Sequence, residues 1–406
     1  MKRFIILTTT IRNMGGAQMY AANKMQYFEH LGWKPEIYFH NKGPVKIGYF
    51  KQFEDNLFPE LLRPFIEFGK QEREQIAHRI LGDFKESDEI LLECHTPELA
   101  YWGEYLAKKC NGKNTIYLLE EAFPKFTAKE VDFYEFKFDR KELLNSVEES
   151  LRRIFTNRYD ETKHGGDKYH IRAYCENVID YTPIQLPVEV KEADHSIISI
   201  GRLDKPYIKP MLDEILEFTG EHRDKIFNLI VVGGDWENKM NDYIRDLFSK
   251  RENVRLFLLG YIFPIPYDWV KISDVSIASS NSILVSANEG VPTIGIDIHD
   301  YQPIGVYKHT TDNLWSRENE PLTPLSEWLE EVLIKGKFPK KLIEHNLADE
   351  LGEHLKPHLD KLNDSAKSKE YFDVENMYSV GERLVYKVKK ILRPLYKRIR
   401  TNNKKV

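Results

Sequence analysis

Cysteine is scarce in this sequence, and long apolar runs are missing from it. Three cysteines occur among 406 residues, at positions 94, 110 and 175. They are too few and too widely spaced for a disulfide framework or a cysteine-rich metal site. No apolar run approaches the roughly 18–20 residues that span a bilayer. We therefore expect a cytoplasmic protein without a transmembrane helix.

The N-terminus has the basic start of a signal peptide but too short an apolar core. Met1, Lys2 and Arg3 precede only four consecutive apolar residues, whereas a signal-peptide core has roughly 7–15. We expect residues 4–8 to form a buried strand instead. With 41% apolar and 12% aromatic residues, the chain can fill the cores of two ordinary domains.

Charge is nearly balanced overall but unevenly placed. The formal net charge is −5, yet ten Lys or Arg and no acid lie between Arg383 and Val406, which leaves −15 on residues 1–382. Because this body is acidic, we expect no nucleic-acid partner. In the basic tail, residues 387–405, bases alternate with Val, Ile, Leu and Tyr. That mixture favours contact with an anionic membrane surface over a solvated terminus or nucleic-acid binding.

Short apolar segments alternate with amphipathic ones, which predicts parallel sheets joined by helical crossovers. A proline-containing break at 182–195 divides the pattern into two doubly wound α/β domains, 1–183 and 184–369, that face an interdomain cleft. The predicted strands are 4–8, 33–39, 90–93, 115–119, 153–156, 196–200, 228–232, 254–258, 274–278 and 293–296. The predicted helices are 15–31, 97–110, 210–219, 237–250 and 283–289.

One glycine-containing turn follows the first strand of each predicted domain. Gly15 and Gly16 open a helix, where the backbone can approach a phosphate closely, although a simple tight turn is an equal alternative. Gly201 precedes Arg202, whose planar guanidinium can grip a diphosphate, with Lys205 or Lys209 as a second charge. The alternative for Arg202 is a surface ion pair with Asp204 or Glu214.

A cluster of metal-ligand residue types ends the strand at 293–296. Asp297, His299 and Asp300 are close in sequence, but lone clusters of this kind in loops are usually not metal sites. We expect neither a metal nor a resident cofactor.

The order of motifs along the chain resembles the family-four glycosyltransferases of the GT-B fold. The motifs are Gly-Gly-Ala-Gln at 15–18, Ile-Gly-Arg-Leu at 200–203, Leu-Gly-Tyr at 259–261, Asn-Glu-Gly-Val-Pro-Thr at 288–293 and Tyr-Phe-Asp-Val-Glu-Asn-Met at 371–377. The resemblance implies a nucleotide-sugar donor in the second domain and an acceptor in the first. It also implies that residues 370–390 are a helix crossing back to the first domain, ahead of a basic C-terminal end at 391–406.

The resemblance implies roles for residues around the donor and the acceptor. Tyr261 and Phe263 lie where the family holds the base. His95 resembles the first of two histidines that the family often carries, and Glu120 and Glu121 stand where the second is expected. A carboxylate there can act as a base or stabilise positive charge at the anomeric carbon.

The sequence departs from the family at two glutamates that usually contact the donor. Their positions fall on Ile277 and Val285. A polar run of Ser280, Asn281 and Ser282 can instead offer groups to the sugar or phosphate. Glu289 is a candidate for the ribose contact, or is a solvent-facing helix end.

Taken with these features, the resemblance implies a metal-independent, retaining glycosyltransferase. It would move a sugar from a nucleoside-diphosphate sugar to a glycan or lipid-linked glycan, in bacterial surface polysaccharide synthesis at the inner face of the cell membrane. A sugar-nucleotide epimerase or hydrolase of the same fold is one alternative. A catalytically inactive partner protein is another, favoured by the missing glutamates.

Overall fold

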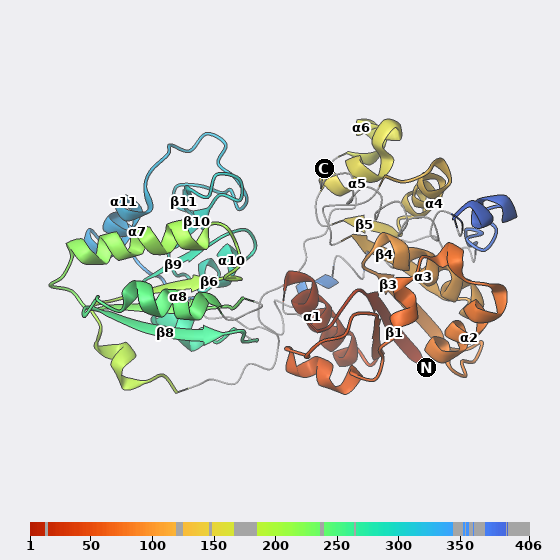
Figure 1. The fold of residues 1–406 in the computed structure, drawn as a ribbon, viewed down its shortest axis with the longest axis horizontal. Helices are drawn as coiled ribbons and strands as arrows, with labels where there is room; N and C mark the ends of the chain where they lie inside the picture. The colour runs from red at the N-terminus through yellow and green to blue at the C-terminus, as the bar shows by residue number, and fades with distance from the viewer. Residues whose placement is uncertain are drawn as a thin grey trace, which may run out of the picture. The chain divides into compact units, whose positions relative to one another are not determined.

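The protein folds into two compact units, described here from a computed structural model (Figure 1). Unit 1 comprises Met1–Tyr174 and Gly352–Val406, and unit 2 comprises Cys175–Leu351. The structure describes residues 1–12, 15–118, 125–145, 148–165, 185–235, 239–263, 265–343, 352–353, 355–356, 360, 370–386 and 388. Among these residues, no helix is long and apolar enough to cross a membrane.

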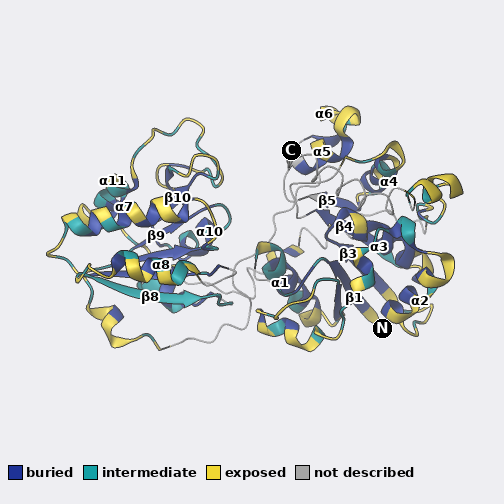
Figure 2. Ribbon diagram, in the orientation of Figure 1, coloured by how far each residue is buried: buried dark blue, intermediate teal, exposed yellow. Residues whose placement is uncertain are grey.

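Unit 1 is built on a five-stranded parallel sheet in the order β2-β1-β3-β4-β5. Its strands are apolar because helices cover a parallel sheet and bury it, and the sheet is dark blue in Figure 2. The strands are β1 (Lys2–Thr8), β2 (Lys34–Phe39), β3 (Glu89–Cys94), β4 (Lys113–Leu118) and β5 (Leu143–Asn145). The helices are α1 (Gly16–His30), α2 (Lys70–Leu81), α3 (Pro97–Cys110), α4 (Ala128–Asp139), α5 (Glu148–Phe155) and α6 (Glu161–His164). Short 3-10 turns complete it: η1 (Gly48–Phe53), η2 (Pro59–Leu62), η3 (Phe65–Glu67) and η4 (Thr156–Arg158).

Local sequence signals place the ends of α3 where they were predicted. Pro97 occupies the first turn, where its missing N–H is no loss. The hydroxyl of Thr96 accepts a hydrogen bond from the Leu99 amide, and Asn111 ends the helix in a left-handed conformation. The helix therefore begins just after the end of β3 and ends just before the start of β4.

Unit 2 is built on a six-stranded sheet in the order β11-β10-β9-β6-β7-β8. Its strands are β6 (His195–Ile200), β7 (Phe227–Val232), β8 (Val254–Gly260), β9 (Val275–Ala278), β10 (Thr293–Ile296) and β11 (Pro303–Val306). Its helices are α7 (Ile208–Glu221), α8 (Lys239–Phe248), α9 (Tyr267–Ile272), α10 (Ser282–Ala287) and α11 (Leu325–Leu329). A 3-10 turn, η6 (Val188–Glu192), precedes β6, and a π turn, η7 (Glu330–Ile334), follows α11.

Two sequence-based expectations are corrected. Residues 153–156, predicted as a strand, lie at the end of α5 and in the following 3-10 turn. Leu151, Ile154 and Phe155 are buried at a helical spacing that a four-residue window conceals. The second sheet is not parallel throughout, since β11 pairs antiparallel with β10. Only six residues separate these strands, too few for a crossover.

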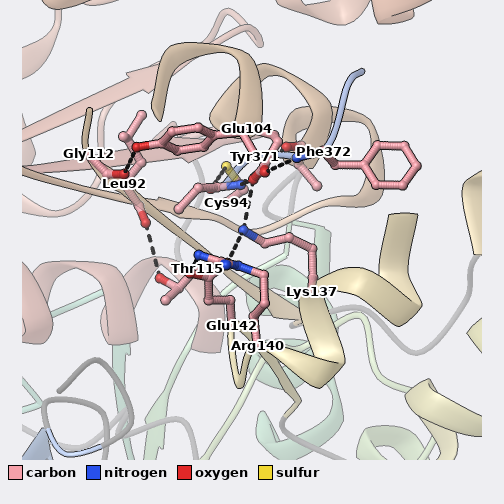
Figure 3. Close-up of polar contacts among 12 residues, drawn as sticks. Leu92, Cys94, Glu104, Gly112, Thr115, Lys137, Arg140, Glu142, Tyr371 and Phe372 are labelled. Carbon is pink, nitrogen blue, oxygen red and sulfur yellow. Dashed lines mark hydrogen bonds and ion pairs between the residues drawn. The ribbon is translucent and has the colours of Figure 1, made fainter. Parts of the chain in front are cut away.

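The C-terminal segment after residue 370 packs on unit 1 through a buried polar network (Figure 3). One carboxylate oxygen of Glu104 accepts from the Phe372 amide at 2.9 Å, and the other accepts from Lys137 at 2.8 Å. Lys137 also pairs with Glu142 at 2.5 Å. Although burial acts to lower the pKa of Lys137, the two carboxylates raise it. The hydroxyl of Tyr371 donates to the Gly112 carbonyl at 2.9 Å, so the segment is anchored at two neighbouring points.

Candidate functional site

Three loops of unit 2 meet at the carboxyl edge of its sheet, where ligands bind in doubly wound folds. The loops follow β6, β7 and β8, and backbone hydrogen bonds join them. Gly201 donates to the Val232 carbonyl, Leu203 to Gly234 and Gly233 to Gly260, at 2.9–3.0 Å. We call residues 201–203, 233–234 and 260–261 the glycine junction.

Close packing in the glycine junction requires glycine at its centre. A Cβ on Gly233, which has a φ of 142°, would lie 1.7 Å from the Gly201 carbonyl oxygen. A Cβ on Gly234 would lie 2.7 Å from the ring of Tyr261. Glycine at these two positions therefore lets the three loops and the Tyr261 ring pack directly on one another at this edge of the sheet.

Arg202 emerges from the glycine junction with its side chain 41% exposed. Its Nε lies 3.4 Å from the Asp204 carboxylate, which is the ion pair weighed as the alternative to function. Burial raises the pKa of Tyr261, Asp204 adds to this rise, and the charge of Arg202 opposes it. The guanidinium thus acts on the same ring that closes the junction. A half-exposed pair of this kind leaves guanidinium N–H groups for an anion.

The two lysines proposed beside Arg202 differ in their surroundings. The ammonium of Lys209 lies 4.9 Å from the centre of the Tyr243 ring on α8. Lys205 is exposed, and among the described residues its ammonium makes no hydrogen bond or ion pair. Lys205 is therefore the freer of the two to meet a ligand.

The polar run 280–282, at the start of α10, already makes backbone hydrogen bonds within the protein. Ser280 has a φ of 59°, and its amide donates to the Leu314 carbonyl at 3.1 Å. Asn281 and Ser282 are half-buried. Glu289 is 2% exposed, and its carboxylate lies 3.3 Å from the Lys271 ammonium. The Glu289 side chain is thus held inside unit 2 rather than facing solvent.

The residues assigned to the base are half-buried at the end of β8. Tyr261 closes the glycine junction, and Phe263 lies two residues further on. The positions of the family's two glutamates, Ile277 and Val285, are buried in the apolar interior at 0% and 6% exposure. Neither of these two side chains offers a polar atom to a ligand.

In unit 1, the glycine pair forms the turn into α1. Gly15 is the residue before the helix, and its carbonyl accepts from the amides of Gln18 and Met19. Gly16 is the first helical residue. The Gln18 side chain donates to the Thr10 carbonyl at 3.2 Å, which ties the turn back to the segment after β1.

His95 lies at the carboxyl end of β3 within a buried polar cluster. Its Nε2 lies 3.1 Å from Glu93, and its Nδ1 lies 3.3 Å from the Thr8 hydroxyl. Glu93 also pairs with the Lys24 ammonium and accepts from the Tyr20 hydroxyl at 2.9 Å. Burial lowers the pKa of Lys24, and the attraction of Glu93 opposes this. Both nitrogens of His95 are engaged, so the cluster fixes the orientation of the ring.

Several residues of these sites were not singled out from the sequence. Glu93, Lys24 and Tyr20 were missed, although Tyr20, Lys24 and Phe28 follow at intervals of four on the buried face of α1. A lysine in such a position is the signal that could have been used. Gly233 and Gly234 were missed too, although they follow β7 as Gly201 follows β6. Glu120 and Glu121 lie outside the described residues.

The Asp297 carboxylate in the acidic loop after β10 is already hydrogen-bonded to backbone amides of the protein. The two oxygens of Asp297 accept from the amides of His299 and Arg317 at 2.7 and 2.8 Å. Burial acts to raise the pKa of Asp297, but these backbone donors lower it overall. Asp300 forms an ion pair with Arg317. In the part of the chain that the structure describes, no group of three His, Cys, Asp or Glu side chains could hold a metal.

Comparison with known proteins defines the fold class. No protein-family model and no curated protein matches the sequence. The chain is similar to a glycosyltransferase of Rickettsia africae (14% identity, TM-score 0.51, covering 97% of this chain and 98% of that one). It is also similar to TarM of S. aureus, solved with UDP (11%, 0.51, 90% and 99%), and to HepE of Anabaena, solved with UDP-glucose (12%, 0.50, 89% and 98%). The protein has the GT-B fold, the two-sheet architecture predicted from its sequence.

Proposed function

We propose that the protein is a retaining glycosyltransferase that uses a nucleoside-diphosphate sugar. The observation that carries this proposal is the glycine junction, where closely packed backbone, the Tyr261 ring and the half-exposed side chain of Arg202 come together at the carboxyl edge of the second sheet. The similar HepE and TarM structures hold UDP-glucose and UDP, which supports a nucleotide-sugar donor.

In the proposed reaction, the bond between the anomeric carbon and the diphosphate oxygen breaks. The acceptor oxygen bonds to the same face of that carbon, and the nucleoside diphosphate leaves with the electron pair. Arg202, with Lys205 or Lys209, stabilises the leaving charge without a metal. Gly15 and Gly16 approach the donor phosphates, while Ser280, Asn281 and Ser282 serve the sugar and ribose. Tyr261 and Phe263 hold the base.

The acceptor in this proposal is a glycan or lipid-linked glycan of a bacterial surface polysaccharide. Its hydroxyl is received by unit 1, where Glu120 or Glu121 accepts its proton and His95, held by Glu93 and Thr8, lies on the acceptor side. We further propose that the enzyme works at the inner face of the cell membrane and touches it through the basic tail 387–405, most of which lies outside the described residues.

Thermal unfolding with a panel of nucleotides and sugar nucleotides tests the donor site. A nucleotide at 100 times its dissociation constant adds about 2.7 kcal/mol to stability, which raises the melting temperature by roughly 5 °C or more for a unit of this size. We expect one nucleoside-diphosphate series to give this shift and Arg202→Ala to abolish it. Arg245→Ala, an exposed arginine on α8, is the matched control and should keep the shift.

The absence of any shift in the wild-type protein would reject the transferase. A second candidate, a non-catalytic partner protein, is favoured by the burial of Ile277 and Val285 at the family's glutamate positions. Donor turnover separates the two candidates. A transferase should release nucleoside diphosphate from a sugar nucleotide when acceptor-containing membranes are added, whereas a partner protein should release none.

A further inference from the structure

A helix near the C-terminus displays an apolar stripe to solvent. Residues 380–386 and 388 are helical, and the helix starts at a reciprocal cap. The Ser379 amide donates to Glu382 at 2.7 Å, and the Glu382 amide donates to the Ser379 hydroxyl at 3.2 Å. Val380, Leu384 and Val388 are 84%, 64% and 47% exposed, and Val385 beside them is 52% exposed. We call these four residues the outer stripe.

The polar contacts of the same helix are made with neighbouring segments of unit 1. The Glu382 carboxylate pairs with Lys129 of α4 at 2.8 Å. The Arg383 guanidinium donates to the carbonyls of Tyr378 and Glu375. This helix, blue in Figure 1, lies beside α3 and α4, and most of it is coloured as exposed in Figure 2.

An ordinary surface helix turns its apolar face to the core, whereas this helix leaves its aliphatic side chains exposed. Residues four apart share a helix face, so the outer stripe is one continuous aliphatic strip. Contacts with Lys129 and with backbone carbonyls hold it outward. The Tyr378 hydroxyl adds a hydrogen bond to Glu130 at 2.7 Å, and the anchors at Tyr371 and Phe372 fix the segment that precedes it.

We propose that the outer stripe inserts into the headgroup region of an anionic bilayer and binds unit 1 to the membrane surface. Charge selects this partner: from Arg383 onward the chain carries ten basic residues and no acid. Aliphatic residues beside lysines and arginines are the composition of interfacial helices. A nucleic acid would pair with the lysines and arginines but would leave the aliphatic outer stripe without a partner. The inference deepens the membrane contact of the proposed function and locates its apolar part before residue 389.

Vesicle binding of the full-length protein tests the proposal. Wild-type protein should sediment with phosphatidylcholine vesicles that contain phosphatidylglycerol, but weakly with phosphatidylcholine alone, and 0.5 M salt should weaken the binding. The double variant Val380→Asp/Leu384→Asp should lower the vesicle partition coefficient at least about tenfold. Each of the two aliphatic side chains adds to the binding free energy when its apolar surface leaves water. Leu322→Asp removes an equally exposed leucine (66%) in unit 2 and should bind as wild type does.

Three outcomes would overturn the proposal. One is a double variant that binds anionic vesicles as the wild type does. The second is a single-stranded oligonucleotide that binds more tightly than the vesicles. The third is a stable dimer that the double variant dissociates, since a second copy would then cover the outer stripe. Vesicle binding is measured without nucleotide and the thermal shift without vesicles, so either proposal can fail alone. Unchanged thermal unfolding of the variant verifies its fold.

Discussion

Replacing Lys24 by methionine is expected to destabilise unit 1 by about 3–5 kcal/mol, because it leaves a buried carboxylate without its cation. The Lys24 and Glu93 side chains are each 1% exposed, so water cannot take the place of the lost ammonium. Tyr20 and His95 still contact Glu93, but two polar donors do not neutralise its charge. Urea denaturation of the wild type and the variant measures the difference.

A double-mutant cycle identifies the buried pair as the cause. Adding Glu93→Gln to Lys24→Met removes the stranded charge and should recover at least half of the loss. Lys2→Met is the matched control, because Lys2 and Glu89 form an ion pair that is more than half exposed, and such pairs contribute at most about 1 kcal/mol. If Lys24→Met cost no more than Lys2→Met, the cluster around His95 would not be held by charge.

The fold could be predicted from the sequence because burial leaves a local trace. Strands β1, β6 and β10 are apolar runs, and both sheets bury them on two faces. The proline at position 97 and the glycine pair at the start of α1 mark helix starts without any tertiary information. The failures have local causes too. The three-residue strand β5 is too short to show a period, and the pairing direction of β11 depends on the length of its loop.

The sites were only partly predictable, because their contacts join distant segments. Arg202 could be found since it follows a strand and a glycine within one short window. The pair of Lys24 and Glu93 spans 69 residues, and a single sequence carries no sign of such a partner. The same limit applies to Glu289, which is buried beside Lys271, a residue 18 positions earlier in the chain. Residue type therefore indicated the ligand chemistry, while the tertiary structure determined which side chains remain available for it.

Gly233→Ala is expected to destabilise unit 2 by about 2–6 kcal/mol and to abolish the nucleotide-dependent thermal shift. The new Cβ would lie 1.7 Å from the Gly201 carbonyl oxygen, and a backbone atom cannot move aside as a side chain can. Overpacking costs about 1–3 kcal/mol, and the positive φ adds about 1–3 kcal/mol of backbone strain. Urea denaturation and the nucleotide panel measure the two effects.

Two neighbouring glycines separate backbone strain from loss of the site. Gly260 also has a positive φ, 67°, but a Cβ there would meet nothing within 4 Å. Gly260→Ala should therefore cost only about 1–2 kcal/mol of stability and keep the nucleotide-dependent thermal shift. Gly234→Ala would press on the Tyr261 ring, which can rotate away, so we expect modest destabilisation but a weakened shift. Equal behaviour of all three variants would show that the close packing of the glycine junction does not shape the donor site.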